Sequence, residues 1–171
     1  MFSEYPGFLK GNILCYTLVW QKHMEITCPL FSNEENIPQK YACDGENINP
    51  PLVISGDVPP DTKSLALVIF DPDAPGKGWV HWVLWNMDPG TRTIEESFVP
   101  AGAVEGMTDF EKPGYGGPCP PRGETHHYQF RLYALDAFLD IPESSTMGDF
   151  DVAIGGHVLD YAVLVGIYGR A

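Results

Sequence analysis

Basic residues are scarce in this sequence. Ten lysines and arginines stand against 23 aspartates and glutamates, which gives a formal net charge of −13 over 171 residues. Such a charge repels phosphate backbones and anionic membrane surfaces at long range. We therefore expect no nucleic-acid partner, and any bound anion must be held by short-range contacts inside a local pocket.

Paired cysteine motifs and long apolar runs are also lacking. None of Cys15, Cys28, Cys43 and Cys119 shows the CxxC spacing that is typical of zinc ribbons and redox motifs. We interpret them as free thiols in a reducing compartment, hence in a cytoplasmic protein, with a bridge between Cys28 and Cys43 as the alternative. The apolar piece 13–20 is too short to span a bilayer, so integral membrane association is not expected.

The first 23 residues fit the rest of the chain poorly. They show neither the small-residue cleavage site of a signal peptide nor an Arg-rich amphipathic pattern. We expect residues 1–23 to form an N-terminal extension outside the fold, with Met24 as an alternative start of the protein. Residues 24–171 are then one domain, which is long enough to bury an ordinary core without metal or disulfide support.

Turn-forming residues, by contrast, are abundant. Sixteen prolines and 18 glycines favour a β-rich fold with many turns over a helical bundle. The apolar runs 64–70 and 80–87 are typical of central strands buried on both faces, and the alternation over 127–134 predicts another strand. Weaker patterns predict strands over 24–28 and 37–43, the prolines at 50 and 51 favour an extended chain into 52–54, and 161–168 is predicted to be the closing strand.

One helix is expected near the C-terminus. Ser145 or Thr146 can cap its first turn, although Gly155 and Gly156 within the pattern weaken the prediction. Its inward face would hold four apolar residues, Phe150, Ala153, Ile154 and Val158. Residues 91–111 show little periodicity, and so long a loop in a compact domain is usually functional or packed as a lid.

Two corners rich in glycine and proline carry most of the chemically useful side chains. The first corner reads DPDAPGKGWVH over residues 71–81, and the second reads YGGPCPPR over 115–122, just before the strand at 127–134. If the corners meet, their carboxylates, imidazoles and phenols line one polar pocket with aromatic walls. The side chains are Asp71, Asp73, Trp79, His81, Tyr115, His126, His127 and Tyr128.

Four interpretations of these side chains are open. The aspartates can simply cap turn amides beside structural histidines. Asp and His can bind zinc or manganese, although no two histidines share the spacing of one helical face. Hydrolysis needs a nucleophile, and without a GxSxG motif only Cys119 is a reactive-thiol candidate. Finally, protonated imidazoles, backbone N–H groups and phenols can bind a phosphate-like anion or an ammonium-phosphate ligand.

These motifs resemble those of the phosphatidylethanolamine-binding protein (PEBP) family, most closely its bacterial and archaeal Raf kinase inhibitor-like branch. The resemblance extends from about residue 24 through residue 170. It implies a mainly β fold of two packed antiparallel sheets, with one or two short helices near the C-terminus. It rests on DPDAP at 71–75, Trp79, HW at 81–82, GPCPP at 117–121, HHY at 126–128 and YALD at 133–136.

By motif position the resemblance also implies a set of ligand-binding residues. Cys119 would contribute its backbone N–H, and His126 is preferred over His127 because it keeps the HxY spacing to Tyr128. The resemblance implies no metal ion, cofactor or catalytic residue. The ligand-binding residues are Asp71, Asp73, Trp79, His81, Tyr115, Gly117, Cys119, His126 and Tyr128.

We therefore expect a protein that binds a small phosphate-containing ligand or a phospholipid head group without catalysing a reaction. Binding would modulate a protein partner such as a kinase or a protease. One alternative is a hydrolase or lyase that uses the Asp/His pocket as acid and base. Another is a pure protein-interaction module, in which the pocket is a relic and an exposed sheet edge forms a homodimer.

Overall fold

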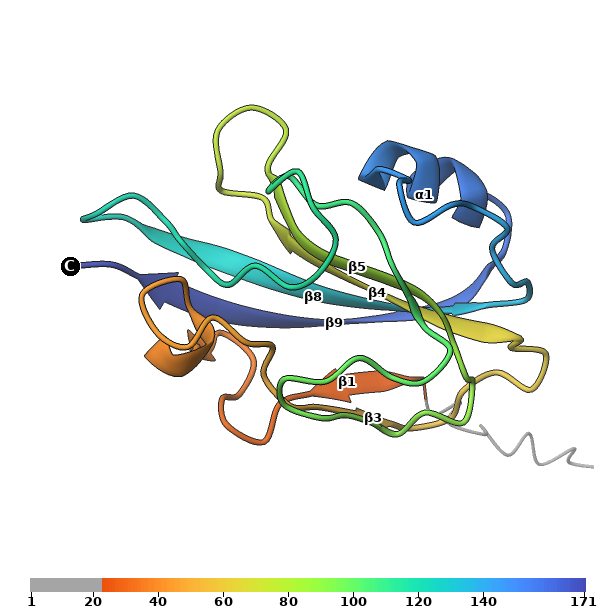
Figure 1. Ribbon diagram of the computed structural model, residues 1–171. Coiled ribbons are helices and arrows are strands. Elements are labelled where there is room, and N and C mark those ends of the chain that lie inside the picture. Colours follow the sequence, from red (N-terminus) through yellow and green to blue (C-terminus); the bar gives the residue numbers. More distant parts are fainter. Residues whose placement is uncertain (1–22) are drawn as a thin grey trace, which may run out of the picture.

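The computed structural model describes residues 23–171, which form two facing β-sheets and one α-helix (Figure 1). The strands are β1 (Glu25–Thr27), β2 (Glu35–Asn36), β3 (Leu52–Ser55), β4 (Ser64–Asp71), β5 (Trp79–Met87), β6 (Thr93–Ile94), β7 (Val104–Glu105), β8 (Thr125–Leu135) and β9 (Val158–Gly169). A 3₁₀ helix covers Gln39–Tyr41, and α1 covers Met147–Ile154. The fold predicted from the sequence, mainly β with two sheets and a short C-terminal helix, is confirmed.

The larger sheet has the strand order β2-β9-β8-β4-β5-β7, and the smaller has the order β1-β3-β6. Every pairing is antiparallel except that of β2 with β9. In Figure 1 the smaller sheet lies below the larger sheet, and α1 lies above the larger sheet. The larger sheet is therefore the middle of three layers.

The middle position of the larger sheet explains the apolar runs of its central strands. In β4, Leu67 and Ile69 pack toward the smaller sheet, whereas Ala66 and Val68 pack with Phe150 of α1 on the opposite face. Because both faces of the strand are covered, its sequence is apolar almost without interruption. Strand β8 instead alternates, with Tyr128, Phe130 and Leu132 fully buried between the sheets. These predicted strands are therefore confirmed.

The structure corrects the strand predicted over 37–43. The N–H groups of Tyr41 and Ala42 bond back to the carbonyls of Pro38 and Gln39, which makes a 3₁₀ turn. The apolar residues at 37, 41 and 42 lie in the core through this turn and not through strand alternation. The predicted strands at 24–28 and 161–168 lie at β1 and β9, and the segment expected to be extended, 52–54, lies in β3.

The predicted helix exists, but it is shorter than its sequence pattern. Thr146 is the N-cap, and its side chain and that of Asp149 form a capping box. The two glycines end the helix instead of interrupting it, since Gly155 is the C-cap and Gly156 has a φ of 81°. The prediction that Val158 faces inward was wrong, because Val158 begins β9 and is 41% exposed.

The long loop after β5 first forms β6, which pairs with β3 in the smaller sheet, and then returns to the edge of β5 as β7. The N–H groups of Gly106 and Asp109 bond to the carbonyls of Val83 and Val80, and the Asp109 carboxylate accepts from the N–H of Val80 at 2.7 Å. The loop therefore brings its next residue, Phe110, to the end of β5 where the site lies.

The cysteines differ from the prediction. Cys43 and Cys119 form a disulfide that links the 3₁₀ segment to the GPCPP loop, and Cys28 is buried as a free thiol. Both the free-thiol interpretation of Cys43 and Cys119 and the alternative bridge from Cys28 were therefore wrong. The disulfide also removes one reason for expecting a cytoplasmic protein.

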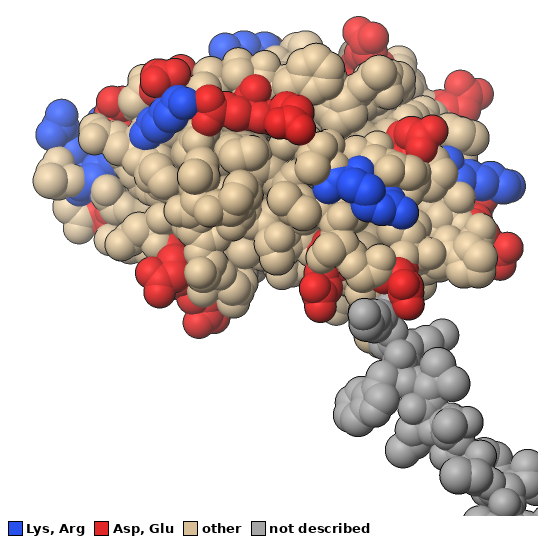
Figure 2. Space-filling view, turned by 90° about the horizontal axis from the view of Figure 1, so that it is seen from below, with Lys and Arg blue, Asp and Glu red and all other residues tan. Residues whose placement is uncertain are grey.

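The charged side chains of the folded part are dispersed. On the face seen in Figure 2, acidic and basic side chains are interspersed, and no continuous basic patch forms there. None of the helices within residues 23–171 is long and apolar enough to cross a membrane. Residues 1–22, which include Cys15 and nearly all of the predicted extension, lie outside the described residues.

Candidate functional site

The two corners meet at one end of the larger sheet, where they enclose a cavity of about 280 Å³. The corner between β4 and β5 supplies one side, and the GPCPP loop with the start of β8 supplies the other. Phe110 of the long loop completes the wall. The lining residues are Asp71, Ala74, Pro75, Trp79, His81, Phe110, Cys119, Pro121 and His126.

Gly78 allows the first corner to close. It has a φ of 82°, and a Cβ at this position would lie 2.3 Å from the Phe70 ring and 2.7 Å from the carbonyl oxygen of Asp71. Only glycine fits such a tight approach at a positive φ. The chain then enters β5 with Trp79 opposite Asp71 in the register, so Trp79 and His81 follow directly at the cavity.

Asp71 connects the two halves of the site. Its Oδ1 accepts hydrogen bonds from the N–H groups of Asp73 at 2.9 Å and Ala74 at 3.1 Å, which shapes the corner. Its Oδ2 lies 2.8 Å from Nδ1 of His126, and both side chains are more than 90% buried. One carboxylate therefore fixes the turn and orients an imidazole from a distant strand.

The Asp71 pair favours the charged form of His126. Burial lowers the pKa of His126, but its hydrogen bonds to Asp71 and Glu124 outweigh burial and raise the pKa above its ordinary value of 6.5. Nδ1 faces Asp71, and Nε2 lies 3.2 Å from the Glu124 carboxylate. Because a carboxylate oxygen faces each ring nitrogen and carboxylates accept, the arrangement favours the doubly protonated imidazolium.

The pKa of His81 is shifted in the opposite direction from that of His126. Its Nδ1 lies 2.7 Å from the carbonyl oxygen of Gly116, and because a carbonyl only accepts, Nδ1 carries the proton and donates it. Burial lowers the pKa of His81, which the Gly116 carbonyl and the charge of Asp71 offset only in part. His81 is therefore a neutral imidazole whose Nε2 is an acceptor.

Tyr128 lies behind both imidazoles. Its ring packs edge-on against His81 at 5.2 Å and nearly parallel to His126 at 6.5 Å between centroids. Its hydroxyl is buried and has no hydrogen-bond partner among residues 23–171. Burial and the charge of Asp71 raise its pKa, so the hydroxyl keeps its proton. The site therefore has an unused buried donor next to two histidines.

Aromatic rings form the outer wall of the cavity. Trp79 is 38% exposed, and Phe110 packs edge-on against it at 5.5 Å and against His81 at 5.4 Å. Cys119 lines the opposite side with Pro121, and its sulfur is bound in the disulfide. The cavity thus pairs a polar inner end with an apolar mouth.

Four predicted residues do not line the cavity: Tyr128, which lies behind the imidazoles, and the three residues described next. Asp73 is 41% exposed in its side chain and bonds to His127 through both its ring, at 2.7 Å, and its N–H, at 2.8 Å. The Tyr115 hydroxyl donates to the carbonyl of Tyr41 at 2.9 Å. Gly117 serves packing, because a Cβ there would lie 2.2 Å from the same Tyr41 carbonyl oxygen.

The structure separates the two neighbouring histidines of β8. His126 is 5% exposed and shares the inward face with Tyr128, whereas the side chain of His127 is 52% exposed and points outward. The placement agrees with the choice of His126 on HxY spacing. Of the nine predicted residues, the structure brings together Asp71, Trp79, His81, Cys119, His126 and the adjoining Tyr128.

Sequence reasoning missed Phe110 and Glu124. Phe110 stands in a loop without periodicity, so no signal placed it near His81. Glu124 stands two residues before His126, and a carboxylate at that spacing near a pocket histidine was a usable signal. Within residues 23–171, no group of three His, Cys, Asp or Glu side chains is arranged to hold a metal ion.

Comparison with known proteins identifies the family. The family model described as phosphatidylethanolamine-binding protein matches residues 27–169, which contain both corners. The chain belongs to the PEBP family.

Relatives in this family share most of the chain. A UPF0098 protein of Methanothermobacter thermautotrophicus is 47% identical over 152 residues, covering 86% of this chain and 99% of the relative. A UPF0098 protein of Aquifex aeolicus is 40% identical, covering 86% and 89%.

Solved PEBP structures have the same fold. The crystal structure of a PEBP homologue from Chlamydia trachomatis superposes with a TM-score of 0.82 at 38% identity, covering 87% of this chain and 99% of that chain. Escherichia coli YbcL, described as a member of the mammalian PEBP family, gives 0.82 at 30% identity with the same coverage.

Proposed function

We propose that this PEBP-family protein binds a small phosphate-like anion, free or as the head group of a phospholipid, without catalysing a reaction. The cavity around His81 and His126 is the binding site, and occupancy modulates a protein partner such as a kinase or protease. The observation that carries the proposal is the buried Asp71–His126 pair, which raises the pKa of His126 and so favours an imidazolium at the inner end of a cavity.

The donors near the cavity support anion binding. The His126 imidazolium supplies a charge-assisted hydrogen bond, and the Tyr128 hydroxyl is a buried donor without a partner. Neutral His81 offers Nε2 as an acceptor, which suits a protonated phosphate oxygen or an ammonium group. A volume of about 280 Å³ accommodates a phosphoryl group and a short organic substituent.

The lining residues favour binding over covalent catalysis. None of them carries a hydroxyl group, and the sulfur of Cys119 is bound in the disulfide. Both oxygens of Asp71 already accept hydrogen bonds, so this carboxylate orients His126 and is not free to remove a proton from a ligand. These features support a non-enzymatic role.

The test is a titration with inorganic phosphate and with phosphoethanolamine, followed by NMR of the histidine side chains. We expect the resonances of His81 and His126 to shift at millimolar concentrations. His127 is an internal control, because it lies on the outward face and bonds to Asp73. Equal shifts at all three histidines would indicate a general salt effect.

A pair of neighbouring variants makes the test sharper. We expect His126→Gln to lose binding, because it removes the cationic donor, and His127→Gln to keep it. Both variants change one histidine on the same strand, so they control for each other. If both bind phosphate as the unmodified protein does, the cavity is not the binding site.

A further inference from the structure

The Glu124 carboxylate accepts a hydrogen bond from Nε2 of His126, the ring nitrogen that does not face Asp71. Glu124 follows the turn at the end of the GPCPP loop, and its Oε2 lies 3.2 Å from Nε2 of His126. Within residues 23–171, Nε2 has no other hydrogen-bond partner. The Glu124 side chain is 58% exposed, whereas that of His126 is 6% exposed. The contact therefore joins an exposed carboxylate to a buried imidazole.

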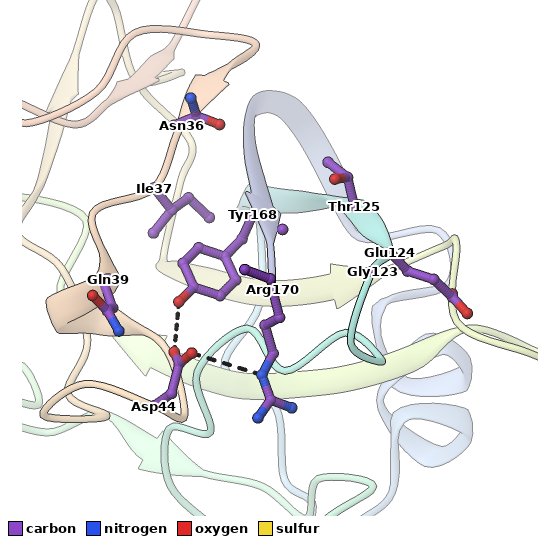
Figure 3. Close-up of a pocket in the computed structure, with 11 residues that line it drawn as sticks. Asn36, Ile37, Gln39, Asp44, Gly123, Glu124, Thr125, Tyr168 and Arg170 are labelled. Atoms are coloured by element: carbon purple, nitrogen blue, oxygen red, sulfur yellow. Dashed lines mark hydrogen bonds and ion pairs between the residues drawn. The ribbon is translucent and has the colours of Figure 1, made fainter.

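Glu124 lines a second, larger cavity of about 680 Å³, whereas His126 lines the first. This second cavity contains Asp44, which bonds to the hydroxyl of Tyr168 and lies 3.7 Å from Nε of Arg170. In Figure 3 the Glu124 side chain lies apart from that group and points away from it. Within the larger cavity the Glu124 carboxylate thus lies apart from Asp44 and contacts Nε2 of His126.

The other three ring nitrogens of His81 and His126 cannot donate a hydrogen bond to a ligand. Nδ1 of His126 faces Asp71 and Nδ1 of His81 donates to Gly116, while Nε2 of neutral His81 carries no proton. Among the two histidines, Nε2 of His126 is therefore the N–H that an oxyanion in the cavity can use. The single N–H at Nε2 can donate to one strong acceptor at a time. Two anionic oxygens held side by side at this nitrogen would also repel each other.

We propose that Glu124 is a built-in competitor that determines which ligands the pocket accepts. Its carboxylate holds the place at Nε2 of His126 that an oxyanion of the ligand takes, so a ligand binds by displacing it. The pocket then selects ligands that bring an anionic oxygen of their own and disfavours neutral and purely cationic ones. This inference rests on the proposed anion-binding function.

The Glu124 side chain can take another position when a ligand displaces it. Its side chain is already more than half exposed, so solvent weakens its contact with His126 and can hydrate the carboxylate once it is displaced. The larger cavity beside it is open and contains Thr125 and Arg170, to which a carboxylate can turn. Glu124 therefore weakens anion binding without preventing it.

Three variants test this role with inorganic phosphate as the probe at fixed pH and ionic strength. Glu124→Ala removes the competitor, and Glu124→Asp keeps the charge but shortens the side chain by one methylene. Glu111→Gln removes one negative charge next to Phe110 without touching His126. We expect the first to bind phosphate about threefold to tenfold more tightly. Glu124→Asp should lie between it and the unmodified protein, and Glu111→Gln should change the affinity by less than about twofold.

A second readout needs no ligand. Because Glu124 contributes to the raised pKa of His126, Glu124→Ala should lower that pKa in an NMR titration of the free protein, whereas Glu111→Gln should leave it in place. The thermal midpoint of each variant checks that it is folded.

The outcomes separate this inference from the proposed function. If the unmodified protein binds phosphate and Glu124→Ala binds no more tightly, or Glu111→Gln gains as much, the competitor role is wrong while anion binding stands. If neither the unmodified protein nor Glu124→Ala binds phosphate, the proposed function fails and this inference fails with it. Binding by Glu124→Ala alone supports both.

Discussion

At the scale of single residues, Asp71 is the group on which the site depends most. Its two oxygens face different segments, one toward the turn amides at 73 and 74 and the other toward His126. A buried carboxylate is costly unless its oxygens are hydrogen-bonded, and both oxygens of Asp71 are. The geometry of the corner and the protonation of His126 are therefore set by the same side chain.

Asp71→Asn should separate these two effects. The amide oxygen can still accept from the turn N–H groups, but the amide nitrogen would face Nδ1 of His126, which must then be an acceptor. We expect the pKa of His126 to fall below its value in the unmodified protein, as measured by NMR titration. Asp73→Asn is the control, because Asp73 bonds to His127 on the outward face.

The Asp71→Asn substitution should also alter how the free energy of unfolding depends on pH. A histidine whose folded pKa is raised stabilises the protein below its ordinary pKa of 6.5, and this stabilisation is lost as pH rises through the folded value. We therefore expect the free energy of unfolding lost in Asp71→Asn to be larger at about pH 5.5 than at about pH 8.5. Denaturation in urea measures it, and an equal loss at both values would contradict the pairing.

The residues of the site were partly accessible from the sequence. His126 was separable from His127 because strand alternation places every second residue on one face, and Tyr128 fixed which face is inward. Asp73 was misplaced because a turn can direct its two aspartates to different sides, and nothing in the spacing reveals which. Glu124 was missed because a surface carboxylate ordinarily needs no explanation.

At the scale of elements, the disulfide ties together two segments that no strand pairing connects. Cys43 follows the 3₁₀ helix, Cys119 lines the cavity, and the two are 76 residues apart in sequence. The N–H of Cys43 also bonds to the carbonyl of Pro118. The wall of the cavity is thus attached to the core through Tyr41 and its neighbours.

Replacing both cysteines by serine should destabilise the oxidised protein. Opening a loop of 76 residues restores conformational entropy to the unfolded chain, which corresponds to about 4.5 kcal/mol of stability in the chain-entropy relation. Urea unfolding of the double variant and the unmodified protein measures the difference. Adding dithiothreitol is the control, because it should bring the unmodified protein close to the variant, and equal stability without it would contradict the bridge.

The elements themselves were predictable where their patterns were strong. β4, β5 and β8 follow from apolar runs and alternation, which reflect burial between layers. The cysteine pairing was not predictable, because it depends on which loops meet in space. The 3₁₀ segment was misread as a strand because three apolar residues in a tight turn resemble a short alternating run.

At the scale of the whole molecule, the charge of −13 is a source of instability. Like charges repel one another most strongly in the compact state. Salt shortens the screening length from about 30 Å at 0.01 M to about 10 Å at 0.1 M. We expect the thermal midpoint to rise by about 2–6 °C over this range, since about 1 kcal/mol shifts it by about 2–4 °C at this size.

Calorimetry in sodium chloride and in potassium chloride tests this expectation. The same rise in both salts indicates screening, whereas a rise in only one indicates a specific ion site. A falling midpoint would mean that attractive ion pairs dominate. Few such pairs are available, because Lys40–Glu96 and Arg170–Asp44 are the lysine and arginine salt bridges within residues 23–171.

The position of Trp79 has an optical consequence. Among the tryptophans of residues 23–171, Trp82 and Trp85 are at most 1% exposed, while Trp79 stands at the mouth of the cavity. Indole emission depends on the polarity around the ring. The solvent-exposed ring of Trp79 and the buried rings of Trp82 and Trp85 therefore emit at different wavelengths. The protein therefore carries its own fluorophore at the entrance of the site, open to a water-soluble quencher and shielded whenever a ligand covers it.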